Sequence, residues 1–149
     1  MHLAGFLGII GVNYERNFLR KRVFCLKNLD LARTALVVID LQKGIMGTGE
    51  LKPYSAAEVL EKNNQLAESF KNTAGWITLV NVDPTTMQLL NKESSGKAYA
   101  NIPVEFSEYV MPIAEDEIAE NVIKVTKHNP GAFFGTDLDL QLRRRGIDT

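Results

Sequence analysis

Residues 34–42 read TALVVIDLQ, and this stretch decides the class of fold. The run from Thr34 to Ile39 is apolar and rich in β-branched residues, without polar alternation. Such a run is typical of a strand that is covered on both faces in a parallel sheet. The stretch therefore predicts a buried first strand that ends in a carboxylate, Asp40.

Further elements follow along the chain. Residues 55–71 have helical spacing of their apolar positions and begin with a Ser-x-x-Glu capping box. Residues 76–82 (WITLVNV) and 122–126 (VIKVT) are apolar, β-branched runs that predict a second and a third strand. Between them, residues 83–121 are broken by prolines and a glycine, so we expect them to be mostly irregular.

A last helix is predicted after the third strand. Thr136 is placed to cap it, and Asp137 and Asp139 in its first turn suit the positive end of the helix dipole. Arg143–Arg145 fall in the last turn, and Gly146 stands where a helix stops. Strands alternating with helices indicate an α/β fold, a three-layer α/β/α doubly wound parallel sheet.

The C-terminal residues carry a separate signal. Residues 146–149 (GIDT) read like a turn that enters a fourth strand. Three strands leave a long sheet edge without its neighbour, whereas parallel sheets of this class normally continue. We therefore expect the C-terminal part of the fold to be missing, and the chain to associate through its open edge.

The N-terminal segment, residues 1–31, is expected to be an extension outside the domain, disordered or not native to it. Residues 3–12 (LAGFLGIIGV) are apolar, but a membrane-spanning helix needs about 20 residues. A secretory signal wants basic residues before the apolar run, whereas Arg20–Arg22 follow it. A signal or membrane-surface segment stays open as the alternative, and we expect no membrane partner.

The composition excludes several classes of function. Seventeen basic and 18 acidic residues leave a net charge of −1 in 149 residues, so there is no electrostatic footprint for nucleic acid. Cys25 is the single cysteine, and the histidines are His2 and His128. A single cysteine excludes an internal disulfide, and one cysteine with two histidines argues against a metal centre. We expect a cytoplasmic protein without a metal.

Two polar residues end strands of the predicted sheet. Asp40 follows the first strand and Lys127 follows the third, and chemistry in open α/β sheets sits at these carboxyl ends. Taken singly, Asp40 could be a loop carboxylate that caps backbone amides, and Lys127 a solvated surface lysine. Because both reach the same edge, we interpret them as a catalytic pair that abstracts a proton and holds it near an anion.

Three further residues carry weaker signals. His128 could be a general base, but beside Lys127 and before an Asn-Pro turn it also reads as a loop histidine. Asp83 ends the second strand where a metal ligand could lie, yet no histidine follows it. Cys25 precedes the first strand, away from the carboxyl edge, and is interpreted as structural or incidental.

Motifs for cofactors and for a serine nucleophile are missing from the sequence. No Gly-x-Gly-x-x-Gly follows the first strand, and Asp40 in that turn would repel a pyrophosphate. There is also no Walker-type loop and no Gly-x-Ser-x-Gly elbow. We therefore expect no cofactor.

Two later segments are more specific. Residues 127–138 read KHNPGAFFGTDL and residues 142–147 read LRRRGI. Together with TALVVIDLQ they resemble the isochorismatase-like cysteine hydrolase family, whose patterns are V-x-D-x-Q, K-x-x-x-(S/G)-A-F-x-G-T-x-L and L-x-x-x-G-I. The first motif alone is weak, whereas the second with the following helix is strong. The resemblance covers about residues 32–149, which would form the N-terminal part of such a hydrolase domain.

The resemblance implies a doubly wound, Rossmann-type α/β/α fold with an Asp–Lys–Cys triad. By position, the aspartate is Asp40 and the lysine is Lys127. The cysteine belongs to a helix beyond Thr149, so the chain lacks it, and Cys25 does not match it. We therefore expect these 149 residues to be inactive as a cysteine hydrolase.

Analogy also places Gln42 and Phe133 near the substrate pocket. In the family mechanism, the carboxylate takes the thiol proton, the lysine stabilises the thiolate, and the thiolate attacks an amide-type carbon. Family substrates include nicotinamide, carbamoyl amides and ureido compounds, while the vinyl ether of isochorismate is hydrolysed without the cysteine. Nicotinamidases bind a metal after the second strand through Asp and His, and the sequence after Asp83 departs from that pattern.

Three hypotheses follow. The first is a hydrolase acting on a small amide, ureido or vinyl-ether substrate. The second is a cysteine-free or non-catalytic family member, and the third is a flavodoxin-like domain that binds a small ligand and shares only the architecture. By resemblance, we expect a small-molecule substrate and a homo-oligomer.

Overall fold

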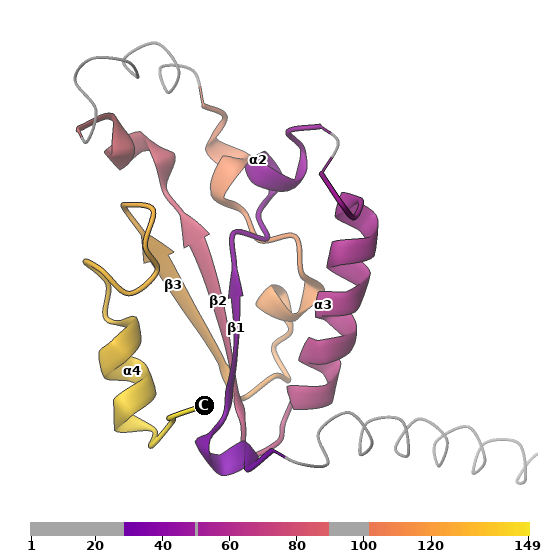
Figure 1. Cartoon of the computed structure of the whole chain (residues 1–149), viewed down its shortest axis with the longest axis vertical. Coiled ribbons are helices and arrows are strands. Elements are labelled where there is room, and N and C mark those ends of the chain that lie inside the picture. Colours follow the sequence, from indigo (N-terminus) through magenta and orange to yellow (C-terminus); the bar gives the residue numbers. More distant parts are fainter. Residues whose placement is uncertain (1–28, 50, 90–101) are drawn as a thin grey trace, which may run out of the picture.

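The sheet has three parallel strands in the order β1-β2-β3 (Figure 1). They are β1 (Ala35–Ile39), β2 (Trp76–Val82) and β3 (Val122–Lys127). The computed structural model describes residues 29–49, 51–89 and 102–149, so the predicted extension lies outside the described residues up to residue 28. The three predicted strands are confirmed, with β2 matching residue for residue and Lys127 lying inside β3.

Helix α3 (Ala56–Phe70) covers one face of the sheet (Figure 1). It starts with the predicted capping box: the Ser55 hydroxyl accepts from the Glu58 N–H, and the Glu58 carboxylate accepts from the Ser55 N–H. Its buried residues join strand residues in one core cluster, made of Val38, Ala67, Phe70, Ile77, Leu79, Met111, Ile113 and Ala114. This packing fixes β1 and β2 against a single long helix.

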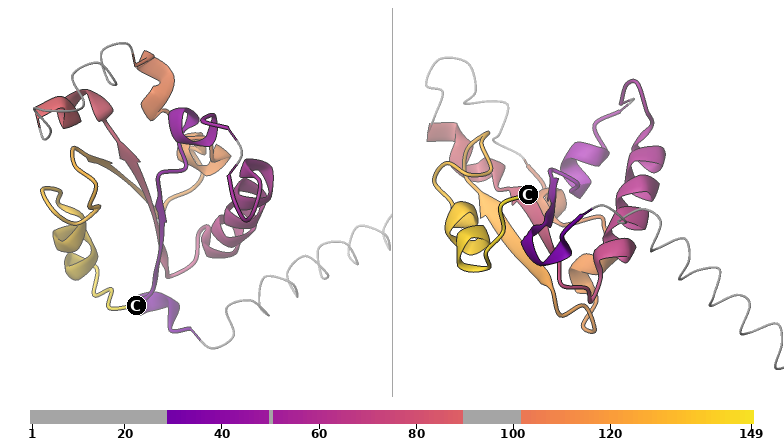
Figure 2. Two further views of the ribbon diagram at one scale, coloured as in Figure 1. Left: turned by 45° about the horizontal axis from the view of Figure 1, so that its top comes forward. Right: turned by 60° about the horizontal axis from the view of Figure 1, so that its bottom comes forward.

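Helix α4 (Leu138–Arg144) covers the opposite face, and all three views place the two helices on opposite sides of the sheet (Figures 1 and 2). A second core cluster lies beneath it, made of Val80, Ile123, Val125, Ala132 and Leu138. The prediction that Thr136 is the N-cap is wrong, because the cap residue is Asp137. Thr136 still accepts from the Leu138 N–H at 3.3 Å while donating to the Ala132 carbonyl, so its hydroxyl supports the loop before the helix.

Short elements make the remaining connections. They are the 3-10 turns η1 (Leu31–Arg33), η2 (Pro84–Leu89), η3 (Val104–Ser107) and η4 (Pro112–Glu115), and the one-turn helix α2 (Lys43–Met46). The expectation that residues 83–121 are mostly irregular is confirmed for their described part. The three layers and the parallel order agree with the predicted α/β/α class.

Strand β1 is less buried than its sequence predicts. Only Val38 is fully covered, and Ile39 is 43% exposed. Core clusters lie against both faces of β1, with Leu36 and Val38 on the α3 side and Val37 on the α4 side, but Leu36 and Val37 are only partly buried. Among the described residues, β1 has one neighbouring strand, β2. On its other side the Ala35 N–H donates to the carbonyl of Thr149, and the N–H groups of Asp148 and Thr149 donate to the Arg33 carbonyl.

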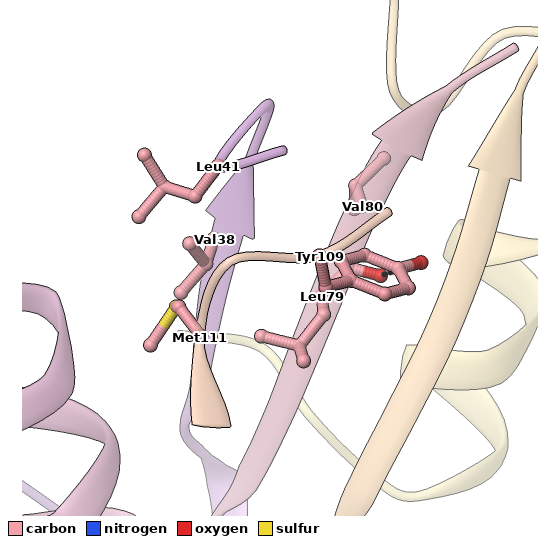
Figure 3. Close-up of a pocket in the computed structure, with 6 residues that line it drawn as sticks. All are labelled: Val38, Leu41, Leu79, Val80, Tyr109 and Met111. Atoms are coloured by element: carbon pink, nitrogen blue, oxygen red, sulfur yellow. Dashed lines mark hydrogen bonds between the residues drawn. The ribbon is translucent and has the colours of Figure 1, made fainter. Parts of the chain in front are cut away.

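A small apolar depression lies beside β1 and β2 (Figure 3). Its lining is Val38, Leu41, Leu79, Val80, Tyr109 and Met111. The one polar group, the Tyr109 hydroxyl, contacts the carbonyls of Leu79 and Val125 at 3.2 and 3.4 Å. Burial raises the pKa of this phenol to about 12, so the hydroxyl keeps its proton. The depression is part of the core packing and includes neither Asp40 nor Lys127.

Candidate active site

Asp40 and Lys127, 87 positions apart in the sequence, meet at the carboxyl edge of the sheet. The ammonium Nζ of Lys127 donates to Asp40 Oδ2 at 3.0 Å and to the carbonyl of Pro130 at 3.0 Å. Lys127 is 3% exposed, whereas about a third of the Asp40 side chain reaches solvent. The structure therefore joins a buried cation to a carboxylate that stays accessible.

The backbone of Asp40 explains how its side chain reaches the lysine. Val38 packs in the core on the α3 face, while Val125, two residues before Lys127, packs on the α4 face. Simple alternation would place Asp40 and Lys127 on opposite faces. Asp40 instead has φ = 66°, a conformation that is uncommon for residues other than glycine, while its N–H keeps its bond to the Val80 carbonyl. The turn redirects the carboxylate toward the lysine, and conformations of this kind cluster at functional sites.

One oxygen of the Asp40 carboxylate lacks a donor. Oδ1 is buried and has no hydrogen-bond partner within the described part of the chain. A buried acceptor without a donor is costly, so native structures usually supply one from protein or water. This oxygen is therefore ready to accept a proton or a hydrogen bond from a group that comes to the site.

Gln42 lies two residues further on and is fully buried. Its Oε1 accepts from the Val82 N–H at 2.7 Å, and its Nε2 donates to the carbonyls of Val82 and Phe106 at 3.0 Å each. The side chain thus ties the loop after β1 to the end of β2 and to η3. A substrate contact of Gln42 stays a prediction, and what the contacts provide is support for the turn that carries Asp40.

Phe133 lies in the loop that follows β3, six residues beyond Lys127. It is 52% exposed, and its neighbour Phe134 is 80% exposed. The same loop supplies the Pro130 carbonyl to the Lys127 ammonium. Sequence reasoning missed this contact, although the Asn-Pro-Gly turn signature at residues 129–131 marks a loop that folds back on itself.

His128 belongs to a small cluster with Asp83 and Thr86. The Thr86 hydroxyl donates to the Asp83 carbonyl at 3.0 Å and lies 3.1 Å from His128 Nδ1. Hydrogen bonds from Thr85, and to a smaller extent the nearby His128, lower the pKa of the Asp83 carboxyl. The general-base reading of His128 stays open.

Within residues 29–49, 51–89 and 102–149, no group of three or more His, Cys, Asp or Glu side chains gathers in a way that could hold a metal ion. Cys25 and His2 lie outside the described residues. Over the same ranges, no helix has the length and apolarity needed to cross a membrane.

Comparisons with known proteins place the chain in a family. The family model "Isochorismatase domain" matches residues 34–149. The chain is 38% identical over 126 residues to the uncharacterized isochorismatase family protein YwoC of Bacillus subtilis, covering 82% of this chain and 62% of that protein. It therefore spans about three fifths of the length of this relative.

Solved structures agree. An isochorismatase family protein from Burkholderia thailandensis superposes with a TM-score of 0.63 at 34% identity, over 78% of this chain and 60% of that one. An N-carbamoylsarcosine amidase from Thermoplasma acidophilum gives a TM-score of 0.52 at 27% identity, over 78% and 64%. A flavodoxin-like domain that shares only the architecture is thereby excluded. With its three parallel strands and its matched motifs, the chain belongs to the isochorismatase family.

Proposed function

We propose that this domain carries the Asp–Lys half of a hydrolytic site that acts on a small amide, ureido or vinyl-ether substrate. The observation that carries the proposal is the Asp40–Lys127 pair at 3.0 Å, in which one carboxylate oxygen is held by the lysine and the other has no donor among the described residues. Similarity to an N-carbamoylsarcosine amidase supports the amide class.

The two residues have different roles in this proposal. Asp40 Oδ1 accepts the proton of an incoming nucleophile, which is a cysteine thiol in the family pattern. Lys127 holds the other carboxylate oxygen in place and stabilises the thiolate that forms. The thiolate attacks the carbonyl carbon of the amide, the C–N bond breaks, and the amine leaves with the proton; water then releases the acid.

A second candidate is a cysteine-free reaction on a vinyl ether. No cysteine lies among the described residues, and in this reading Asp40 is the proton donor to the ether. The coding DNA beyond the Thr149 codon separates the two. A further strand followed by a helix that starts with cysteine favours the cysteine hydrolase, and another residue at that position favours the cysteine-free reaction.

The test is an assay of the encoded protein against nicotinamide, an N-carbamoyl amino acid and a vinyl ether. Lys127→Met replaces the ammonium by an apolar group of similar length. We expect one substrate class to be hydrolysed and this variant to lose turnover while its circular dichroism is retained. Unchanged turnover in Lys127→Met would refute the assignment of the site.

We also propose that the protein is a homo-oligomer with a small-molecule substrate. Along a parallel strand, the backbone N–H and C=O groups of successive residues point alternately to the two neighbouring strands. The Ala35 N–H points to the side of β1 away from β2, where it donates to the Thr149 carbonyl. Val37 and Ile39 therefore present their backbone groups to that side, where a further strand can cover them. Light scattering on the purified chain checks this, and a monodisperse monomer would contradict it.

A further inference from the structure

We propose that Asn129 is a positioning residue that holds the Pro130 carbonyl against the Lys127 ammonium and, through the same loop, sets the place of Phe133. The inference rests on the proposed function for its catalytic meaning. Nothing in the matched family pattern specifies this residue, because it falls on one of the three variable positions after the lysine.

The contacts of Asn129 close a six-residue loop, residues 129–134. Its Oδ1 accepts from the Gly131 N–H at 3.0 Å, and its Nδ2 donates to the Phe134 carbonyl at 2.7 Å. One amide group thus ties the start of the loop to its end. Gly135 completes the closure with φ = 72°, and a Cβ on it would lie 3.1 Å from Asn129 Nδ2, closer than side chains usually pack.

Lys127 depends on this closed loop. Its ammonium has three donors, and the described contacts use two of them, one on Asp40 and one on Pro130. Proline offers a carbonyl and no N–H, so the carbonyl that faces the lysine is oriented by the chain around it. Loss of the two Asn129 hydrogen bonds therefore allows Pro130 to move. The Lys127 ammonium then loses one of the two described contacts that position it against Asp40.

The exposed end of the loop is fixed by the same bonds. Phe133 and Phe134 project into solvent, while Ala132 between the turn and these rings is buried in the core under α4. The loop is anchored below by Ala132 and closed by Asn129, so the two aromatic rings extend from a rigid base. A single side chain thus links the position of the lysine to that of the two exposed aromatic rings.

Asn72 provides a matched control at the opposite end of the sheet. Its Oδ1 accepts from the Glu120 N–H and its Nδ2 donates to the Ile118 carbonyl, which is the same pair of bonds that Asn129 makes. It also has φ = 54°, where alanine is strained. An Asn72→Ala variant should therefore lose at least as much stability as Asn129→Ala.

The experiment measures the rate at which a small acylating reagent modifies Lys127 in the folded 149-residue chain, by mass spectrometry, as a function of pH. In Asn129→Ala we expect modification about tenfold faster, since one or two lost hydrogen bonds weaken local protection by about that factor. In Asn72→Ala the rate should equal that of the wild type. The pH profile separates a change in exposure from a change in ionisation.

The outcomes divide clearly. An unchanged rate in Asn129→Ala, or equal acceleration in both variants, overturns the proposal. If Asn129→Ala fails to fold, Asn129→Asp is used instead, because it keeps the acceptor for Gly131 and replaces the donor to the Phe134 carbonyl by a charged acceptor. It is compared with Asn72→Asp, which introduces the same charge, and it is expected to accelerate labelling. No acceleration relative to that control overturns the proposal. Labelling does not depend on turnover, so a failure of the hydrolase assay leaves this result readable by itself.

Discussion

The two ends of the sheet treat polar side chains in opposite ways. At the amino end, Asn121 is 6% exposed and all of its amide is used: Nδ2 donates to the carbonyls of Phe70 and Gly75, and Oδ1 accepts from the Asn72 N–H. These bonds join the end of α3 to the starts of β2 and β3. Every polar atom of this side chain serves the fold.

The carboxyl end is arranged differently. Asp40 has a positive φ and a buried Oδ1 without a partner in the described part of the chain, and Asn81 also has a buried oxygen of this kind. A buried lysine completes the set. Such features lower stability, and proteins retain them mainly where function requires them. Polar groups at the amino end hold the chain together, whereas some at the carboxyl end have no hydrogen-bond partner among the described residues.

The largest effect is expected from Asp40→Asn, which tests the carboxyl end. Asparagine tolerates φ = 66°, so the thermal midpoint should fall by only a few degrees. Loss of the proton acceptor should lower kcat/KM of the active protein by about 10²–10⁴-fold. Asp83→Asn is the control and should keep turnover. Equal kcat/KM in Asp40→Asn and wild type would show that this end is not catalytic.

Asn121→Ala tests the amino end. It removes three hydrogen bonds, those to the Phe70 and Gly75 carbonyls and that from the Asn72 N–H, and we expect the free energy of unfolding to fall by about 3 kcal/mol. Urea denaturation measures this. The rate at which Lys127 is modified in the folded state should stay at the wild-type value. A fall in the free energy of unfolding of less than about 1 kcal/mol would contradict the structural role given to this end.

Gln42→Met sharpens the comparison, because Gln42 is the fully bonded amide of the carboxyl end. Methionine fills a similar volume but leaves the Val82 N–H and the Phe106 carbonyl without their Gln42 partner, while the Val82 carbonyl keeps the Ser107 hydroxyl, so we expect a loss of about 2 kcal/mol in unfolding free energy. Turnover should fall as well, because the turn that carries Asp40 loses its support. A variant with lost substrate affinity and unchanged stability would instead favour a direct substrate contact.

The smallest expected effect is on the stability of the fold at acid pH. Hydrogen bonds from Thr85 lower the pKa of Asp83 at the carboxyl end, and a hydrogen bond from Lys71 lowers the pKa of Asp116 near the amino end. A carboxyl whose folded pKa lies below its unfolded value adds stability above the unfolded pKa, and that stability is lost as pH falls through the folded pKa.

In Asp83→Asn and Asp116→Asn, the free energy of unfolding should fall less than in the wild type as the pH is lowered from neutral to below 3.8, the ordinary pKa of aspartate. Urea midpoints across this range measure it. A steeper fall in either variant would mean that the sign of the shift is wrong.

Much of the fold could be predicted from local pattern. The β-branched runs and the capping box found all three strands and α3, because strand and helix periodicity are properties of neighbouring residues. The N-cap of α4 was misplaced by one residue, since Thr136 and Asp137 are both capable caps and loop packing chooses between them. The burial of β1 was overestimated, because burial depends on which strands lie beside it.

The sequence by itself determined the parallel α/β class, the family motifs and the fact that Asp40 and Lys127 reach one edge of the sheet. Strand direction and chain order are enough for that conclusion, because the carboxyl ends of parallel strands coincide. Only the tertiary structure decided that the two side chains touch, that φ = 66° turns Asp40 toward the lysine, and that Asn129 and Gln42 brace the two loops. The Asp40–Lys127 contact and the Gln42 contacts join residues at least 40 positions apart in the chain, so local preference carries no information about them.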